Sequence, residues 1–490
     1  MTTEAPPKLH MVRFGVEVTT KGRGTRRHFQ NRLVRNLTDA IESEGHKASV
    51  ESRWSRLLVE VSAPEALEAM SRVFGISSIS PVDARIPADL EEIVARGEEL
   101  FAERVRGKTF AVEARRVGSH DFRSQDVRER LGAALLPHSA GVNLDDPEAT
   151  VSVEVRDQEA FLFSERVPGH GGLPLGVEGK AVCLLSGGFD SAVAAWHLLK
   201  RGVSLEYVFC NLGGAAYERS VLALAKVLAD RWSYGDRPRI HVLEFGPTVD
   251  ALRSHTTGGY WQVLLKRLMY RAAGAVAEDV GGDGVVTGES LGQVSSQTLG
   301  NLRAIDDAVD LPVFRPLLGM EKMDIVERAH AIGTGAISAR VREYCAIYEG
   351  KPVTHARPDR VAKEEEKLPE DLLDEPIRGR KVVDLRSLDP VELVAPYLFV
   401  EEIPRDAVVL DLRSRRDFEA WHVPGAVRKD PSELRPDRVR DLEKEETYLL
   451  YCEHGLQSAD AAEAMQREGY EAYAFRGGLG RLRKAVTATT

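Results

Sequence analysis

Two short segments of this sequence combine residue types that could perform chemistry together. The first, Ser186-Gly187-Gly188-Phe189-Asp190-Ser191, lies between an apolar stretch and a stretch with helical spacing. Small residues in such a turn let backbone N–H groups approach an anion, and the N-terminus of the following helix adds about half a positive charge. The turn lacks the lysine and the spacing of a Walker A loop. It therefore predicts a phosphate site of another kind, with a Gly-rich turn that binds nothing as the alternative.

The second segment, Cys452-Glu453-His454-Gly455-Leu456-Gln457-Ser458, also follows an apolar stretch and precedes a helical pattern. Backbone N–H groups around such a loop, together with the helix dipole, favour the thiolate form of a cysteine and make its sulfur reactive. A buried structural cysteine is the alternative. The loop is accompanied by Asp411-Leu412-Arg413, His422-Val423-Pro424-Gly425-Ala426 and Phe475-Arg476-Gly477-Gly478. Together these segments resemble a rhodanese domain, whose active cysteine carries a persulfide, although Gln457 stands where many rhodaneses have arginine.

The elements that must position the first segment alternate between strands and helices. Residues 182–185 are wholly apolar, as expected for a strand of a parallel sheet that is covered on both faces. Further strands are predicted over 205–210, 239–245 and 284–287, and helices over 192–201, 220–231 and 261–278. This alternation predicts a doubly wound parallel sheet within residues 178–356.

The rest of the chain divides into smaller units. Residues 1–62 read as strand, helix and strand, and residues 63–167 as a second α+β unit that ends at the Gly- and Pro-rich residues 168–174. Residues 357–394 are rich in acidic and poor in apolar residues, which predicts a linker. Residues 395–490 predict a second, smaller α/β domain. The expected fold class is therefore a multidomain α/β protein.

Composition narrows the function classes. The 490 residues suffice for three or four domains, and 43% apolar and 29% charged residues are ordinary for a globular protein. No apolar run reaches the roughly 20 residues that cross a bilayer, and residues 1–10 lack the apolar core of a signal peptide. The four cysteines are far apart, which favours a reducing compartment. We therefore expect a cytoplasmic protein without membrane association.

The formal net charge of −10 argues against nucleic-acid binding, but the distribution of charged residues along the chain does not. Residues 1–40 hold eight Lys and Arg against three Asp and Glu, and residues 101–130 hold eight against five. A locally basic N-terminal part is what a phosphate-binding module requires. A solvated basic face without a partner is the alternative.

The loop at residues 186–191 matches the S-G-G-x-D-S signature of the PP-loop ATP pyrophosphatases, which adenylate a substrate as they cleave ATP to AMP and pyrophosphate. Adenylation beside a sulfur-carrying cysteine indicates sulfur insertion, because AMP is a good leaving group and a persulfide is a strong nucleophile. Over nearly all of its length the chain resembles the tRNA 4-thiouridine synthetases, also called ThiI. The most specific segments are Asn211-Leu212-Gly213-Gly214-Ala215-Ala216, residues 287–298 and Glu343-Tyr344-Cys345, with residues 116–122 similar to a THUMP domain.

The resemblance implies roles for individual residues. Positions that would bind ATP are Leu184, Leu185, Ser186, Gly187, Gly188, Asp190, Ser191, Phe209, Cys210, Lys266, Gly288 and Gln297. Asp190 would help to organise magnesium pyrophosphate, and Lys322 would act at the phosphates during adenylation. Cys452 would carry the persulfide, and Cys345 would then form a disulfide with Cys452 that a reductant opens.

The resemblance also implies the reaction and the partners. The first domain would be ferredoxin-like and the second a THUMP domain, and both would grip the acceptor region of tRNA. The uridine at tRNA position 8 would be adenylated at O4 and receive sulfur there. A cysteine desulfurase, which is a pyridoxal phosphate enzyme, would supply the sulfur to Cys452. A second acceptor would be ThiS, the sulfur carrier protein of thiamine thiazole synthesis, and the expected assembly is a homodimer.

Two alternatives follow from the same residues. The main role could be sulfur delivery to the thiamine carrier, although such a relay requires only the last domain. The chain could also be a tRNA-binding protein with decayed sites, although Asp190, Lys322, Cys345 and Cys452 are all present.

Overall fold

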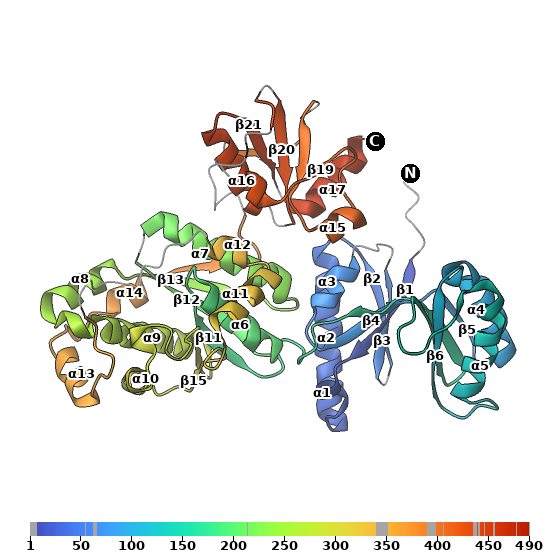
Figure 1. Cartoon of the computed structure of the whole chain (residues 1–490). Helices are drawn as coiled ribbons and strands as arrows, with labels where there is room; N and C mark the ends of the chain where they lie inside the picture. Colours follow the sequence, from blue (N-terminus) through green and yellow to red (C-terminus); the bar gives the residue numbers. More distant parts are fainter. Residues whose placement is uncertain are drawn as a thin grey trace. The chain divides into compact units, whose positions relative to one another are not determined.

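The structure is a computed structural model that describes residues 7–53, 55–61, 66–212, 214–339, 351–389, 398–404, 406–434, 439, 442–444, 446–453, 456–476 and 478–489. The chain divides into two compact units, Met1–Gly172 and Leu173–Thr490 (Figure 1). This division falls inside the Gly- and Pro-rich boundary predicted from the sequence. Among the described residues, no helix is both long enough and apolar enough to cross a membrane.

The first domain is built on an antiparallel sheet in the order β10-β4-β1-β3-β2. Its strands are β1 (Lys8–Phe14), β2 (Ala48–Arg53), β3 (Arg56–Val61), β4 (Ile76–Pro81) and β10 (Val167–Pro168), and its helices are α1 (Val16–Thr19), α2 (Arg23–Ser43) and α3 (Ala66–Arg72). The long helix α2 buries Phe29, Leu33, Leu37 and Ile41, which recur at helical spacing. The helix predicted between the two strands of residues 1–62 is confirmed.

The boundary expected at residue 62 lies inside this first sheet. Strand β4 pairs with β1 from His10–Pro81 to Phe14–Ile76, and β10 pairs with β4 in turn. The first domain therefore continues to about residue 81 and takes in residues 167–168 as well. The physical reason is that β1 is an inner strand and needs an antiparallel neighbour on each side, which the strand at 57–61 alone does not provide.

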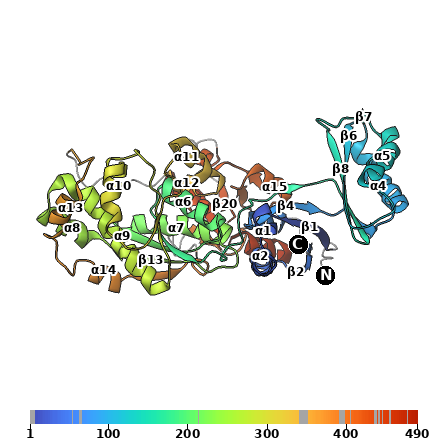
Figure 2. The same ribbon diagram turned by 90° about the horizontal axis from the view of Figure 1, so that it is seen from below.

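The second domain carries a mixed sheet in the order β5-β9-β8-β6-β7. Its strands are β5 (Ala84–Pro87), β6 (Thr109–Val117), β7 (Gly141–Val142), β8 (Ala149–Arg156) and β9 (Glu159–Phe163), and its helices are α4 (Leu90–Val105), α5 (Ser124–Leu135) and the 3₁₀ turn η1 (Leu136–His138). Figure 2 shows α4 and α5 together on one side of β6 and β8. Their buried side chains, among them Ile93, Phe101 and Leu131, form one core with the inner face of the sheet.

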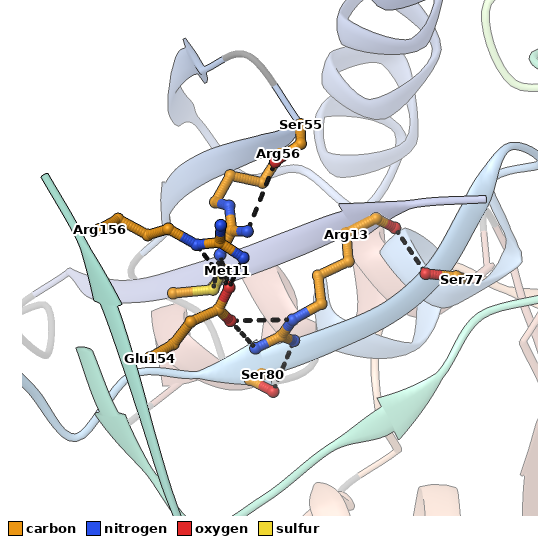
Figure 3. Close-up of polar contacts among 8 residues, drawn as sticks. All are labelled: Met11, Arg13, Ser55, Arg56, Ser77, Ser80, Glu154 and Arg156. Atoms are coloured by element: carbon orange, nitrogen blue, oxygen red, sulfur yellow. Dashed lines mark hydrogen bonds and ion pairs between the residues drawn. The ribbon is translucent and has the colours of Figure 1, made fainter. Parts of the chain in front are cut away.

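Glu154 joins the two sheets of this unit. Its side chain extends from β8 and accepts hydrogen bonds from Arg13 on β1, at 2.9 Å and 3.3 Å, and from Arg56 on β3 (Figure 3). Arg156, on the same strand as Glu154, donates to it at 2.8 Å and 3.0 Å. Glu154 is only 3% exposed, so this carboxylate is a buried charge that three guanidinium groups satisfy.

This arrangement predicts a pH-dependent contribution to stability. Burial would raise the pKa of Glu154, but Arg56 and Arg13 lower that pKa from 4.5 to about 2. The ionised carboxylate thus stabilises the fold above about pH 4.5, by an amount on the order of 3 kcal/mol, and this contribution is lost as the pH falls toward 2. We expect Glu154→Gln to lower the urea midpoint most at pH 7. The difference in urea midpoint between the wild type and Glu154→Gln should shrink below pH 4.5, over the range in which the wild type stays folded. A difference that does not change with pH would contradict the link between ionisation of Glu154 and stability.

The third domain contains the predicted doubly wound sheet. The strand order is β15-β14-β11-β12-β13-β16, with all pairs parallel except β13–β16. The strands are β11 (Lys180–Leu184), β12 (Ser204–Asn211), β13 (Arg239–Glu244), β14 (Val285–Val286), β15 (Val313–Phe314) and β16 (Lys381–Asp384). β11 to β14 overlap the four strands that the sequence predicts.

Two layers of helices cover this sheet. One contains α6 (Phe189–Lys200), α7 (Gly214–Trp232), α11 (Lys322–Ala331) and α12 (Gly335–Ser338). The other contains α8 (Gly246–His255), α9 (Trp261–Val280), α10 (Leu299–Asp306), α13 (Pro358–Glu365) and α14 (Asp374–Arg378), with the 3₁₀ turns η2 (Gly258–Tyr260) and η3 (Ser295–Gln297) nearby (Figure 1). Successive residues of β12 point to opposite layers, and Cys210 belongs to the core under α9.

The acidic stretch 357–394 is not a linker over its described part, which corrects the prediction. Helices α13 and α14 pack on α9, and β16 adds an antiparallel edge strand to the sheet. Val361 is 1% exposed, and Glu365 pairs with Arg267 at 2.7 Å and with Arg271 at 2.9 Å. Apolar residues of this stretch reach the core, and Glu365 finds cationic partners on α9, so the composition of the stretch alone was misleading.

The fourth domain is a small α/β unit with a parallel sheet in the order β17-β21-β20-β18-β19. Its strands are β17 (Phe399–Val400), β18 (Val408–Asp411), β19 (Val427–Arg428), β20 (Thr447–Tyr451) and β21 (Glu471–Phe475). Its helices are α15 (Arg415–Ala420), η6 (Pro431–Leu434), α16 (Leu456–Arg467) and α17 (Gly478–Thr489). The predicted α/β pattern of this part is confirmed.

Candidate functional site

The phosphate loop follows β11 and leads into α6. Ser186 N–H donates to Ser191 Oγ at 3.0 Å, and Ser191 Oγ donates to the Ser186 carbonyl at 3.1 Å, so the ends of the loop are tied together. Gly188 is the N-cap of α6 in an extended conformation, and within the described chain no side chain caps this helix. The N–H groups of its first turn are therefore directed at the place where an anion would bind.

Gly288 lies directly against this loop. A Cβ atom at position 288 would stand 2.5 Å from the Ser191 nitrogen and 2.6 Å from the Asp190 carbonyl carbon. Because β14 is parallel to β11, the segment after β14 reaches the same sheet edge as the phosphate loop. Only glycine allows this close approach of two backbones, which supplies a physical reason for a position that the resemblance had indicated.

Asp190 and Lys322, which are 132 residues apart in the sequence, meet beside the loop. Lys322 Nζ lies 2.9 Å from each carboxylate oxygen of Asp190. Lys322 is the first residue of α11, a helix that packs against α6. Gln293 also donates to Asp190, at 3.0 Å. The sequence analysis did not predict a role for Gln293, although this residue lies in the segment 287–298, one of the most specific parts of the resemblance to ThiI.

The four strand-end residues to which the resemblance assigns the adenosine lie side by side at the ends of β11 and β12. Leu184 pairs with Val208, and the Leu185 N–H donates to the Val208 carbonyl at 2.9 Å, which places these residues beside Phe209 and Cys210. The side chains of Leu185, Phe209 and Cys210 are buried. A nucleotide at this edge would therefore contact these three residues through backbone groups.

Gln297, in the segment 287–298, carries a buried polar atom. Its Oε1 has no hydrogen-bond partner among the described residues, and the residue is 8% exposed. An unsatisfied buried acceptor costs about 1–3 kcal/mol, so a ligand that brings an N–H donor fits this position. The uncapped helix and the Gly288 contact make the loop itself suited to a phosphate group.

A buried ionic network lies behind the segment that contains Gly288. Glu289 accepts hydrogen bonds from Tyr270 at 2.5 Å and from Arg315 at 2.8 Å. Burial would raise the pKa of Glu289, but Lys266 and these two donors hold it below its usual value. Glu289 is therefore an anion beside Lys266, another predicted nucleotide-binding residue. No local sequence pattern indicates that Glu289 is so deeply buried.

The cysteine loop of the fourth domain runs from β20 to α16. The N–H of Ser458, in the first turn of α16, donates to Cys452 Sγ at 3.4 Å, and Cys452 Sγ lies 3.5 Å from Ser458 Oγ. Cys452 itself is 3% exposed. A backbone N–H donor and the first turn of a helix therefore lie at this sulfur. Ser458 was quoted with the loop but was not predicted to contact the sulfur.

Asp411-Leu412-Arg413 begins at the last residue of β18, the strand that pairs with β20 and so lies beside the cysteine loop. Asp411 is fully buried and accepts from the Arg413 guanidinium at 2.7 Å and 3.0 Å. Tyr451, the residue before Cys452, accepts a hydrogen bond from the Val423 N–H at 3.1 Å. The segments that suggested a rhodanese domain therefore meet around the cysteine strand. Cys345, the other predicted catalytic cysteine, lies outside the described residues.

Comparison with protein families assigns each part of the chain. Residues 176–369 match the family described as thiamine biosynthesis protein (ThiI), and residues 9–80 match the ThiI ferredoxin-like domain. Residues 87–165 match the THUMP domain and residues 398–485 the rhodanese-like domain. The first match again places residues beyond 357 with the third domain.

Relatives and solved structures give the same result. A tRNA sulfurtransferase of Pyrobaculum aerophilum is 37% identical over 97% of both chains, and one of Thermoplasma acidophilum is 36% identical over 95% of this chain and 94% of its own. A crystal structure of a 4-thiouridine synthetase–RNA complex with bound ATP superposes with a TM-score of 0.68 at 32% identity, covering 77% of this chain and 99% of its own. The chain therefore belongs to the ThiI family, to which the tRNA sulfurtransferases belong.

Proposed function

We propose that this chain is a tRNA sulfurtransferase that uses ATP to convert the uridine at tRNA position 8 to 4-thiouridine. The observation that carries the proposal is the juxtaposition of the uncapped phosphate loop, Gly288 and the Asp190–Lys322 pair. The names of the relatives and the RNA and ATP in the related crystal structure support the same assignment. The reactive-cysteine loop of the rhodanese-like domain supplies the sulfur chemistry.

The first step would activate the base. The loop N–H groups and Lys322 hold the phosphates of ATP while uridine O4 attacks the α-phosphorus and pyrophosphate leaves. Lys322 neutralises charge that develops on the phosphates. Magnesium would be held chiefly by the phosphate oxygens with Asp190, because no group of three or more His, Cys, Asp and Glu side chains able to hold a metal ion occurs among the described residues.

The second step would transfer sulfur. The terminal sulfur of a Cys452 persulfide attacks C4 of the base and AMP leaves with O4, which yields a disulfide between Cys452 and the base. The Cys345 thiolate then attacks Cys452 Sγ, forming a Cys345–Cys452 disulfide and releasing 4-thiouridine. An external thiol must return two electrons to open this disulfide. A cysteine desulfurase is the proposed source of the persulfide sulfur.

The experiment that tests the proposal is thiolation of unmodified tRNA by the purified chain with ATP, magnesium, a desulfurase, cysteine and a thiol reductant. The product is measured as the near-ultraviolet absorbance of 4-thiouridine. We expect product with the wild type and none without ATP. Persulfide loading of Cys452 without any thiolated tRNA would refute the tRNA assignment.

A second acceptor is favoured by the rhodanese-like domain, because a persulfide can be passed to a protein as well as to a base. We propose the sulfur carrier protein of thiamine thiazole synthesis as this acceptor. The relay would need Cys452 but not the phosphate loop. A variant that lacks tRNA thiolation through loss of Lys322 should therefore still pass sulfur to the carrier, if that carrier is adenylated by its own enzyme.

Lys322 should matter for catalysis but not for stability. Its ion pair with Asp190 is half exposed, and such pairs contribute at most about 1 kcal/mol. We expect Lys322→Met to lower the rate of thiolation about 100-fold, as loss of one charge-stabilising group typically does, with the melting temperature nearly unchanged. The measurement is the single-turnover rate at saturating ATP.

Lys367 offers a matched control for this variant. It pairs with Glu364 at 2.8 Å, and the exposures of both partners resemble those of Lys322 and Asp190, but its partner is not part of the phosphate loop. Lys367→Met should therefore keep the wild-type rate. Equal rates for the two variants would show that Lys322 has no catalytic role.

A further inference from the structure

Glu154 makes a buried polar connection between the first two domains (Figure 3), and the more exposed ion pair between Arg53 and Glu159, at 3.6 Å, also crosses this joint. Arg13 and Arg56 come from neighbouring strands of the first sheet, where they face each other in the β1–β3 register. Both donate to Glu154, which comes from the second sheet. The Arg13 guanidinium also lies over the Phe163 ring of the second sheet, 4.9 Å from its centroid. Two like-charged groups of one domain are thus held together by an anion of the other.

The surroundings of this carboxylate hold the domains together but orient them only weakly. Met11 and Leu58 of the first sheet pack with Phe161 of the second and with Val82 of the connecting segment in a small buried apolar cluster. Apolar contact is non-directional, so such a cluster permits a range of angles. Hydrogen bonds from planar guanidinium groups to a carboxylate do fix an angle. The orientation of the two sheets should therefore depend mainly on Glu154.

We infer that Glu154 is a positioning residue that fixes the angle between the ferredoxin-like and THUMP domains, so that they present one preorganised surface to tRNA. The inference rests on the proposed binding of tRNA by these two domains. If each domain contacts the RNA backbone, motion of one domain relative to the other must stop when RNA binds, and this costs conformational entropy. A joint that already holds the two domains at a fixed angle avoids this entropy loss. Glu154 is buried and would act only through Arg13 and Arg56.

The expected result is a selective loss of tRNA affinity. Glu154→Gln replaces the carboxylate by a neutral amide that cannot balance two buried guanidinium groups, so the joint loosens. We expect the KM for tRNA to rise about tenfold while kcat at saturating tRNA stays within twofold. Persulfide loading of Cys452 should not change, since it takes place in another domain. A role confined to folding would instead lower kcat through loss of active molecules and leave KM unchanged.

Two further variants keep the test decisive. Arg56→Met removes a buried partner that lies on the other side of the joint, and it should reproduce the rise in KM. Glu91→Gln breaks an ion pair with Arg130 that lies within the second domain, and it should leave KM unchanged. An unchanged KM in both Glu154→Gln and Arg56→Met, or a fall in kcat alone, would overturn the inference.

A direct measurement of the joint separates this inference from the proposed function. Genetically encoded spin labels are placed at exposed sites on α2 and α5 of the full-length chain, and the distance distribution between them is measured without RNA. We expect a narrow distribution in the wild type and a broad one in Glu154→Gln. A failure of the wild type to bind tRNA would refute the proposed function, whereas identical distributions in both proteins would refute the role of Glu154.

Discussion

Gly288→Ala is expected to lower ATP-dependent tRNA thiolation about 1000-fold, although it adds a single methyl group. The new Cβ would lie 2.5 Å from the Ser191 nitrogen and 2.6 Å from the Asp190 carbonyl carbon, and both are backbone atoms that cannot rotate away. The phosphate loop or the segment after β14 must therefore move. Misplacement of a catalytic group by about 1 Å costs on the order of 100-fold, and the displaced loop also loses N–H donors to the phosphates.

The test compares this variant with Gly246→Ala. Gly246 begins α8 in the same domain, and a Cβ at that position meets no atom within 4 Å. Binding of ATP, measured by calorimetry, and single-turnover thiolation should both fail in Gly288→Ala and persist in Gly246→Ala. Persulfide loading of Cys452 should persist in both, which shows that the rhodanese-like domain is folded, and a far-ultraviolet circular dichroism spectrum like that of the wild type would show the same for the domain that contains Gly288. Normal ATP binding by Gly288→Ala would mean that the loop tolerates displacement and does not hold the phosphates.

The sequence was informative where a local pattern determines both structure and chemistry. The apolar residues 182–185 followed by two glycines predicted a strand and an anion-binding turn, and both the strand and the turn are present. The loop around Cys452 was predicted in the same way. By contrast, no local pattern shows that Lys322 reaches Asp190, because the ion pair depends on how α11 packs against α6. The family resemblance assigned each residue separately to the phosphates and did not predict the ion pair between them.

The predictions that failed concern segments whose partners are remote. Composition suggested a linker at 357–394, whereas Val361 and Glu365 are buried against α9 by residues about a hundred positions away. Glu154 alternates with Val151, Val153 and Val155 and so lies on the face of β8 opposite their core, in an ordinary strand pattern, and only the first domain explains why its charge is buried. Polar residues in strands are normally assigned to solvent, so a carboxylate that joins two domains is not recognisable from the sequence.

Cys452→Ala should abolish sulfur transfer to any acceptor. The persulfide must form on this sulfur, and removal of the nucleophile from a covalent mechanism typically costs at least about 10⁴-fold. Cys183→Ala is the matched control, because Cys183 is also buried at the end of a strand. Burial raises the pKa of the Cys183 thiol, and among the described residues its sulfur receives no backbone N–H hydrogen bond like that of Ser458 to Cys452. Cys183 should therefore be inert.

Loading with desulfurase and radioactive cysteine separates the two cysteines directly. The wild type and Cys183→Ala should retain label on the protein that a thiol reductant releases, and Cys452→Ala should retain none. The ATP-binding step should be intact in all three proteins, because Cys452 lies in a different domain from the phosphate loop. Normal thiolation by Cys452→Ala would show that sulfur reaches the activated uridine without passing through the rhodanese-like domain, and the proposed relay would then have to begin at another residue.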